Sequence, residues 1–163
     1  MDDLFAVPGA PWVGVSPRLA SLRRWVLVGL AAVIVVALGV EALLVSYGRW
    51  LLVAGVTVLV AAVPVAWSMI GRSVASWAYA ERDDDLFVRR GIMFLRCEVV
   101  PYGRMQLVDV TAGPLQRHFG VATVHLHTAS PDTRARIPGL VPAEAARLRD
   151  RLTTLGEAQA SGL

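Results

Sequence analysis

The sequence predicts a membrane-anchored α+β protein, in which a two-helix transmembrane hairpin precedes a small antiparallel β-barrel or sandwich with a C-terminal capping helix. Two continuous apolar runs, at about 25–46 and 50–70, are each long enough to cross a bilayer core of about 30 Å. Alternating apolar and polar residues follow from 77 to 137, as is typical of half-buried strands. The apolar spacing from Pro142 to Leu155 then predicts one amphipathic helix.

The composition supports a membrane protein with one small domain. Of the 163 residues, 55% are hydrophobic and the mean hydropathy is +0.54, which are values above those usual for a soluble domain. About 90 residues follow the apolar runs, enough for one small domain and too few for two. Cys97 is the single cysteine, so the chain forms no intramolecular disulfide.

The basic charge does not indicate a nucleic-acid partner. All sixteen basic residues are arginines, and the net charge is +3. Arg18, Arg23 and Arg24 precede the first apolar run, where membrane topology alone accounts for them. From residue 72 onward, twelve arginines are nearly balanced by ten acidic residues. We therefore expect the lipid bilayer as a partner, and we expect no nucleic acid, small-molecule substrate, metal or cofactor.

Changes in composition set the expected domain boundaries. The N-terminal segment holds three prolines and lacks an apolar pattern, which is typical of a tail. A glycine at 156 is expected to end the last helix. The expected segments are a flexible N-terminal tail at 1–21, the transmembrane hairpin at 22–72, a cytoplasmic domain at 73–156 and a disordered tail at 157–163.

Aromatic and basic residues predict the membrane boundaries and the orientation of the hairpin. Trp25 and Trp67 fall at one membrane surface, and Tyr47 and Trp50 fall at the other. Four arginines flank the first surface, whereas the hairpin tip has only Arg49. Because cytoplasmic segments carry the excess of arginine, we expect a multi-pass protein with both termini in the cytoplasm.

Glu41 is a candidate functional residue within the first apolar run. It lies 16 residues after Trp25, or about 24 Å along a helix, and so towards the outer surface. An intramembrane carboxylate is a functional candidate by default. The alternative is that Glu41 reaches the outer interface or faces the partner helix, and the sequence favours this alternative.

The segment after the hairpin has the alternation of short antiparallel strands. The three aspartates at 83–85 are typical of a turn between two strands, and 115–119 is expected to form one helical turn. Strands are expected at 77–81, 86–90, 94–101, 106–111, 121–128 and 133–137.

Three motifs in order resemble those of bacterial membrane proteins with a pleckstrin-homology-like (PH-like) domain. They are an arginine-rich strand that ends on glycine at Leu86–Gly91, a Val-Pro and Arg-Met-Gln stretch within Val100–Val108, and a Gly-Pro-Leu-Gln-Arg-His-Phe-Gly turn within Gly113–Val124. The resemblance implies a PH-like, seven-stranded, helix-capped barrel at the cytoplasmic face of the bacterial plasma membrane. It also implies a membrane protein partner, such as a larger relative with repeated copies of the domain.

Four polar residues of this domain are candidates for partner binding. Arg104 and Gln106 are two residues apart, so they share a side of the chain if a strand already runs there, and Arg117 joins them in an apolar context. A guanidinium presents a planar fork of donors to a peptide or an anion. The alternative, which the sequence favours, is that these side chains hold the neighbouring turns. Arg89 is the fourth candidate, on the arginine-rich strand.

The sequence shows no convincing catalytic site. His118, His125 and His127 lack a nearby cysteine or a telling carboxylate, so ordinary exposed histidines are the better interpretation. We expect a non-catalytic adaptor or scaffold that binds protein partners. The alternatives are an anionic-lipid sensor and an accessory subunit of a membrane transporter or enzyme complex. The acidic turn at 83–85 disfavours the lipid sensor, because carboxylates repel anionic headgroups.

Overall fold

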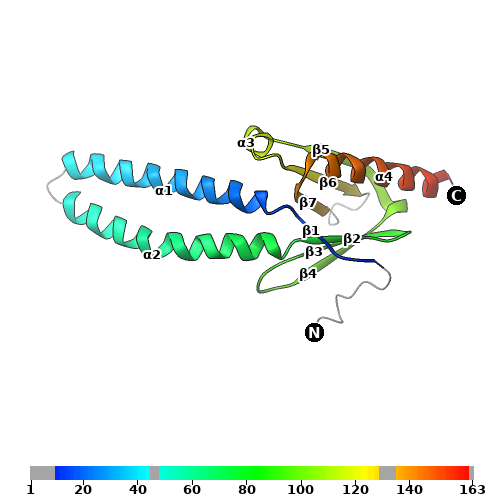
Figure 1. Cartoon of the computed structure of the whole chain (residues 1–163), viewed down its shortest axis with the longest axis horizontal. Coiled ribbons are helices and arrows are strands. Elements are labelled where there is room, and N and C mark those ends of the chain that lie inside the picture. The colour runs from blue at the N-terminus through cyan, green and yellow to red at the C-terminus, as the bar shows by residue number, and fades with distance from the viewer. Residues whose placement is uncertain (1–9, 45–47, 129–134, 162–163) are drawn as a thin grey trace. The chain divides into compact units, whose positions relative to one another are not determined.

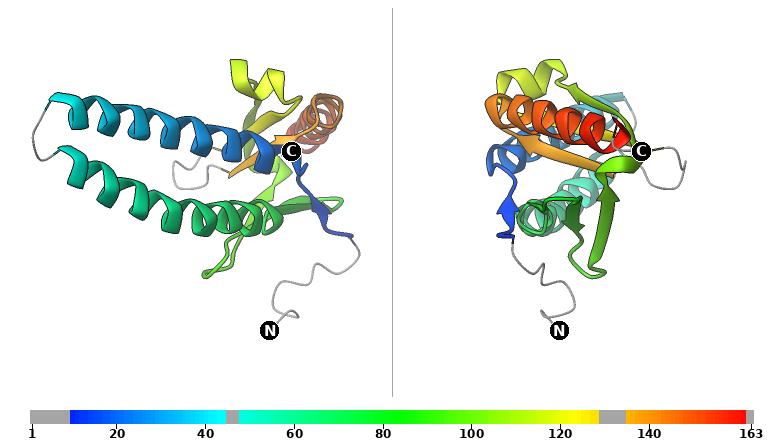
Figure 2. Two further views of the ribbon diagram at one scale, coloured as in Figure 1. Left: turned by 60° about the vertical axis from the view of Figure 1, so that its left-hand side comes forward. Right: turned by 90° about the vertical axis from the view of Figure 1, so that its right-hand side faces the viewer.

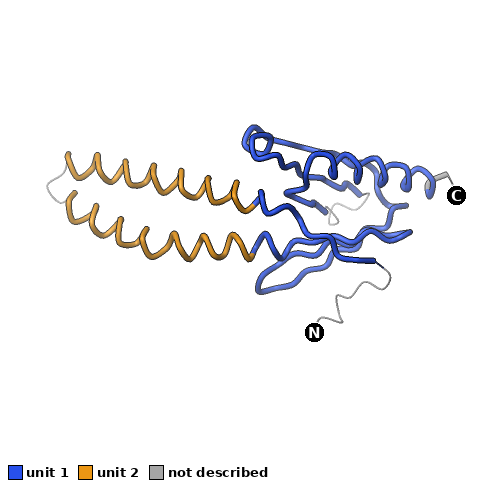
Figure 3. The backbone as a smooth tube through the Cα atoms, in the orientation of Figure 1, with its two compact units in different colours: residues 1–19, 73–163 blue, residues 20–72 orange. Residues whose placement is uncertain are grey.

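The computed structural model divides into two compact units, which are coloured separately in Figure 3. The hairpin unit is Ala20–Arg72, and the domain unit combines Met1–Leu19 with Ser73–Leu163. The residues that the structure describes are 10–44, 48–128 and 135–161.

Two long helices, α1 at Arg18–Leu44 and α2 at Gly48–Ala75, form the hairpin (Figure 1). The most apolar 18-residue window of each helix is 0% buried, as expected of helices that face lipid. Helix α1 begins before the predicted span at 25–46, and α2 begins before and ends after the predicted span at 50–70. The polar residues that flank each span continue the helix. Tyr47 and the predicted end of the first span lie outside the described residues.

The two helices contact each other through small residues and at the arginine-rich end. A Cβ added to Gly55 would overlap Cδ1 of Leu38, so glycine allows the close approach of α2 to α1. At the other end, the Arg24 guanidinium lies 4.8 Å from the centroid of the Trp67 ring. This pair joins a basic and an aromatic residue at the membrane surface where the sequence places Trp67.

The domain unit contains two antiparallel sheets among the described residues (Figure 2). The first sheet has the order β1-β2-β3-β4, and the second has the order β5-β6-β7. The strands are β1 at Val13–Gly14, β2 at Ala78–Glu81, β3 at Asp85–Arg90, β4 at Arg96–Pro101, β5 at Met105–Thr111, β6 at Ala122–Thr128 and β7 at Ala135–Leu140. The helical elements are the 3-10 turn η2 at Tyr102–Arg104, α3 at Pro114–His118 and α4 at Pro142–Ser161.

Both sheets and α4 contribute to one hydrophobic core. The predicted apolar face of α4 is confirmed: Ala145, Leu148 and Leu152 are buried, and Leu155 packs against the core. Sheet residues complete the cluster, among them Tyr79, Leu86, Val88, Val100, Val124, Leu126 and Ile137. Helix α4 packs against η2, β5 and β6 and caps the core, as predicted. The described strands form two sheets and no closed barrel.

The N-terminal segment differs from the predicted flexible tail. β1 pairs with β2, with Val13 opposite Tyr79, and α1 begins at Arg18. Leu19 is buried, and the Ser16 N–H donates to the carbonyl of Gly139 at 2.9 Å. The tail prediction is therefore wrong from residue 13, because proline and glycine do not prevent a short edge strand from pairing. Residues 1–9 lie outside the described part of the chain.

The C-terminal boundary also differs from the prediction, because α4 continues through Gly156 to Ser161. Glycine costs a helix about 1 kcal/mol relative to alanine, which tertiary contacts readily offset. Gly156 is half-buried against the 3-10 turn, and the Gln159 Nε2 atom donates to Oδ1 of Asp84 at 3.1 Å. The segment 157–161 is therefore helical, and the disordered tail predicted from 157 is wrong for it.

Strand positions agree with the alternation pattern, with two changes. The predicted strand at 94–101 begins at Arg96, because residues 91–95 form the turn between β3 and β4. The predicted strand at 133–137 appears as β7 at Ala135–Leu140, and residues 133–134 lie outside the described range. The seventh strand implied by the family resemblance is β1, which the sequence places in a tail.

Candidate functional site

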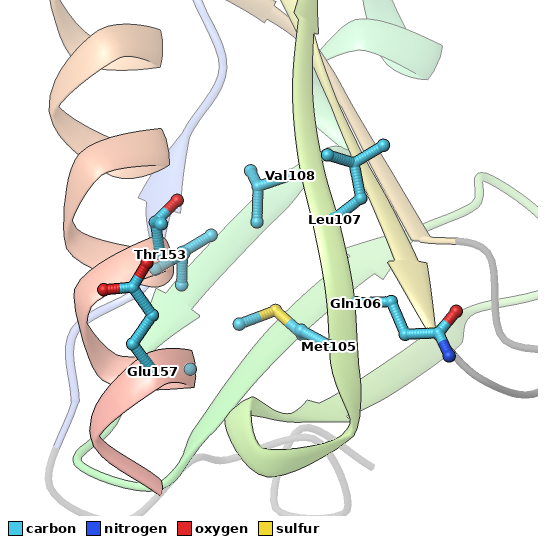
Figure 4. A pocket seen from close by; sticks show the side chains of 8 residues that line it. Met105, Gln106, Leu107, Val108, Thr153 and Glu157 are labelled. Carbon is cyan, nitrogen blue, oxygen red and sulfur yellow. The ribbon is translucent and has the colours of Figure 1, made fainter. Parts of the chain in front are cut away.

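A groove of about 250 Å³ lies between β5 and α4 in the domain unit (Figure 4). Residues 105–108 of β5 form one wall, and Leu152, Thr153, Gly156 and Glu157 of α4 form the other. Its lining is mainly apolar, with the Thr153 hydroxyl and the Glu157 carboxylate as polar groups on the helix side. A concave, largely apolar surface with a few polar groups is the usual form of a binding site.

A β-bulge determines which side chains of β5 face the groove. Met105 pairs with Thr128 and Leu107 pairs with His127, so Gln106 is the extra residue on β5. Figure 4 shows Met105 directed towards α4, and Gln106 directed away from it. The bulge thus keeps Met105 in contact with the core while Gln106 is exposed on the other side of the strand.

The outer edge of β5 carries no partner strand among those that the structure describes. β5 is the terminal strand of its sheet and pairs with β6 alone in the described part of the chain. A strand edge presents a row of backbone donors and acceptors to which another extended segment can add. The groove and this edge are adjacent, so an extended peptide can reach backbone groups and apolar side chains together.

A polar network joins α4 to the first sheet. The Tyr79 hydroxyl donates to Oε1 of Glu144 at 2.7 Å, and the Arg147 guanidinium contacts Glu144 at 2.6 Å and Glu81 at 2.5 Å. Arg151 adds a contact to Glu81 at 3.2 Å. Hydrogen bonds from Arg147 and Tyr79 lower the pKa of Glu144, and burial, with the Glu144 hydrogen bond, raises the pKa of Tyr79.

This network fixes the position of the helix that forms one wall of the groove. The network was not predicted from the sequence, although Glu144 and Arg147, at a spacing of three, form a recognisable helix pair. The contacts to β2 have a separation of more than sixty residues, so no local pattern predicts them.

Comparison with known proteins places the chain in a family. The family model described as "Bacterial PH domain" matches residues 17–155, which is most of the chain. The chain belongs to the bacterial PH domain family. It is also 37% identical over 79 residues to the UPF0699 transmembrane protein YdbS of Bacillus subtilis (strain 168), a match that covers 48% of each chain. This chain thus matches about half the length of that relative. No solved structure matches the present chain.

The family assignment and the two apolar helices together identify a bacterial membrane protein with a PH domain. The predicted family is therefore confirmed. The matched range begins before the first apolar run and ends on α4, so it includes the hairpin as well as the PH domain.

Three of the predicted binding residues do not form one group in this PH domain. Arg104 lies in η2 rather than on a strand, and Gln106 is the bulged residue of β5. Arg117 lies on α3, which follows the other end of β5, about 20 Å away for a seven-residue strand. All three side chains are exposed. Of the three, only Gln106 lines the groove. The predicted cluster therefore separates into two groups, with Arg104 and Gln106 near the start of β5 and Arg117 on α3.

Arg89, the fourth predicted residue, lies on β3 and outside the groove. Its guanidinium lies 4.9 Å from the centroid of the Trp12 ring, on the N-terminal segment that leads into β1. Its neighbour Arg90 pairs with Glu98 at 2.5 Å. These contacts attach the N-terminal segment and β4 to β3, which is a structural role that the sequence did not show.

Glu41 lies in the last turn of α1, three residues before the helix ends at Leu44. Its side chain is exposed on the hairpin unit. This position agrees with the interpretation that the carboxylate reaches the interface near the hairpin tip. A functional role of Glu41 stays a prediction.

The histidines of the PH domain are not assembled for metal binding in the described part of the chain. No group of three or more histidine, cysteine, aspartate or glutamate side chains is placed to hold an ion there. The His125 ring contacts the Thr111 hydroxyl at 3.1 Å, across β6 and β5. Burial raises the pKa of the Cys97 thiol, as for a packed cysteine.

Proposed function

We propose that this protein is a non-catalytic adaptor, anchored in the bacterial plasma membrane, whose PH domain binds an extended segment of a membrane protein partner. One observation supports this function above the others: the outer edge of β5 lies beside a mainly apolar groove. Backbone pairing with such an edge provides affinity, and side-chain pockets beside it provide specificity.

The charges around the groove indicate the chemistry of the partner segment. Glu157 lies on the groove wall, and Asp84 is held near the same end of α4 by Gln159. Arg104 stands just before β5 as an exposed cation. A segment with alternating apolar side chains and a basic residue near Glu157 fits this surface best. A larger PH-domain relative in the same membrane is a partner of suitable class.

Two adjacent residues of α4 allow a matched test of the groove. Thr153 lines the groove, whereas Thr154 is exposed on α4 and does not line it. A photo-crosslinking amino acid at 153, in the full chain in native membranes, should capture a discrete membrane protein. The same amino acid at 154 should capture much less of it. Equal capture from both positions would contradict the groove, and capture of lipid from 153 would favour the anionic-lipid sensor.

We also propose that the protein is multi-pass, with both termini in the cytoplasm. Arg18, Arg23, Arg24 and Arg72 flank the hairpin at one end, against Arg49 at the other. A reporter that is active only outside the cytoplasm, fused after Leu163, should show no activity. Strong activity would overturn the proposed orientation, and also the proposal that the partner binds on the cytoplasmic side.

A further inference from the structure

The turn between β3 and β4 exposes two large apolar side chains next to each other. Met93 is 83% exposed and Phe94 is 85% exposed. They are the two most exposed large apolar side chains among the described residues of the domain unit. Single exposed apolar residues are common on protein surfaces, whereas contiguous exposed apolar surface marks interaction sites, and Met93 and Phe94 are adjacent.

The turn is held in the conformation that exposes them. Gly91 has a φ of +121°, in the region that favours glycine, and a Cβ there would overlap the carbonyl oxygen of Phe94. The Gly91 N–H donates to Oγ of Ser76 at 3.2 Å. The exposure of Phe94 therefore results from a defined turn conformation, which the backbone of Gly91 permits and the hydrogen bond to Ser76 holds against the segment before β2.

The turn lies beside the residues with which the domain unit begins after the hairpin, Ser73 and Ser76. Phe94 and Arg96 line a shallow pocket together with Ser73, the first residue of the domain unit after the hairpin. Ser73 is only three residues beyond Ile70, the last residue of the second apolar run, and both belong to α2. Three residues of helix rise by about 4.5 Å. The chain thus leaves only a short length between the second apolar run and the residue beside Phe94, so the turn is able to reach the bilayer surface.

Charge distinguishes the two ends of β3. The turn at 91–95 is flanked by Arg89 and the exposed Arg96, with Arg90 paired to Glu98, whereas the turn before β3 holds Arg82, Asp83 and Asp84, and Asp85 begins the strand. The six residues of β3 separate the two turns by about 20 Å. Arginines beside apolar side chains match an anionic membrane surface, and the acidic turn lies at the opposite end of β3.

We propose that the turn at 91–95 inserts Met93 and Phe94 into the interface of the same bilayer that the hairpin spans, with Arg96 at the headgroups. Two side chains are too few to hold a soluble domain on a membrane, but the hairpin supplies a tether. Tethering raises the effective concentration of such a weak contact to about the millimolar range. The contact fixes the orientation of the PH domain and keeps the acidic end of β3 away from the lipid.

The same orientation keeps part of the groove accessible. Gln159, at the end of α4, contacts Asp84 in the acidic turn, and the groove residue Glu157 is only two residues from Gln159. The Glu157 end of the groove is therefore associated with the end of the domain that faces away from the bilayer. This arrangement leaves a partner in the cytoplasm free to approach it.

Spin labelling of the full chain in vesicles tests the insertion. In a Cys97→Ser background, a nitroxide is attached at Phe94→Cys or, as the matched control, at Asp83→Cys, and the protein is reconstituted with phosphatidylcholine and phosphatidylglycerol. We expect collisions with a water-soluble nickel reagent to be several-fold lower at 94 than at 83. Collisions with oxygen, which partitions into lipid, should be higher at 94.

Met93→Cys provides a second labelling site and should show the same preference for oxygen. Equal nickel accessibility at 94 and 83 in the purified vesicles would overturn the proposal. Protection of 94 that appears in native membranes but not in purified vesicles would also overturn it, and would indicate a protein partner for the turn. Asp83, Met93 and Phe94 are all exposed and lie outside the hydrophobic core, so replacing them should leave the fold intact.

Discussion

The hairpin unit and the domain unit use the same aliphatic residues in opposite ways. Val58 on α2 is 65% exposed in the protein alone, whereas Leu152 on α4 is 0% exposed. Each position requires an apolar side chain, because lipid surrounds the first and a protein core surrounds the second. Exposure of an apolar residue is thus unfavourable only where the surroundings are water.

The turn at 91–95 holds the most exposed large apolar side chains among the described residues of the domain unit, and so comes nearest to the pattern of the hairpin. Its Phe94 is more exposed than most apolar side chains of the two helices. The comparison therefore separates three kinds of apolar position: buried in the core, exposed along an apolar helix, and exposed at the turn at 91–95. Substitutions at each kind should have different effects.

The largest effect is expected in the core of the domain. Leu152→Asp places an unpaired carboxylate among buried aliphatic side chains and should destabilise the domain by several kcal/mol. Thermal unfolding of the purified full chain in detergent measures it, with Thr153→Asp as the exposed control on the same helix. An unchanged melting temperature for Leu152→Asp would mean that this face of α4 is not buried.

Substitution in the hairpin should affect insertion rather than domain stability. Val58→Asp, near the middle of the second apolar run, should cost about 2.5–3.5 kcal/mol of insertion free energy. The fraction of the chain that integrates into membranes should fall, while Val58→Leu should integrate normally. If Val58→Asp integrates as well as the unsubstituted chain, the second run does not cross the bilayer as a lipid-facing helix.

A smaller effect is expected at the turn. Gly91→Val forces a β-branched residue into a left-handed conformation and against the Phe94 carbonyl, at a cost of about 1–3 kcal/mol. The melting temperature should fall accordingly. Gly113→Ala is the control, because φ at Gly113 is −67° and the nearest atom to an added Cβ is 3.9 Å away. Equal effects of the two substitutions would mean that the turn does not require glycine at 91.

The smallest expected effect concerns one buried phenol in the core. Burial raises the pKa of Tyr102 to about 12, so its neutral form is favoured in the folded state. This stabilisation is complete below the ordinary tyrosine pKa of about 10, and it is lost as the pH rises through 12. The chain has no lysine, but Tyr79, whose pKa burial also raises, loses stabilisation in the same alkaline range, so Tyr102 accounts for only part of the effect.

Tyr102→Phe should therefore flatten the loss of stability in alkali. It also removes the hydrogen bond to the Arg82 carbonyl at 2.9 Å, which should cost about 1 kcal/mol at neutral pH. Denaturation midpoints measured from pH 7 to 12 test both effects. A loss of stability in alkali that is as steep in Tyr102→Phe as in the unsubstituted chain would assign it to Tyr79 rather than to Tyr102.

Local patterns in the sequence predict much of the architecture. The lengths of the apolar runs predict the two helices, the spacing of Ala145, Leu148 and Leu152 predicts the buried face of α4, and alternation predicts most strands. Three motifs also predict the family that the comparisons confirm. Each of these signals depends on residues that are near one another in the chain, so a single sequence is sufficient to recognise them.

The candidate site is less predictable, because it depends on contacts between distant residues. Gln106 lies on the β5 wall of the groove, but the bulge that turns its side chain outward is visible only in the register of β5 against β6. The sequence predicts that Arg104 and Arg117 belong to one polar group. In the fold they lie beyond opposite ends of β5, on η2 and on α3. The groove itself was not predicted, because it requires α4 to pack beside β5.

The sequence by itself therefore determined that this chain has two long apolar helices, a β domain and a capping helix, because hydrophobic length and period are local properties. Only the tertiary structure decided that residues 13–14 join the first sheet, that Gln106 is bulged and that Phe94 is exposed at a turn. Pairing of an edge strand, strand register and the burial of a given apolar residue depend on which distant segments lie beside it.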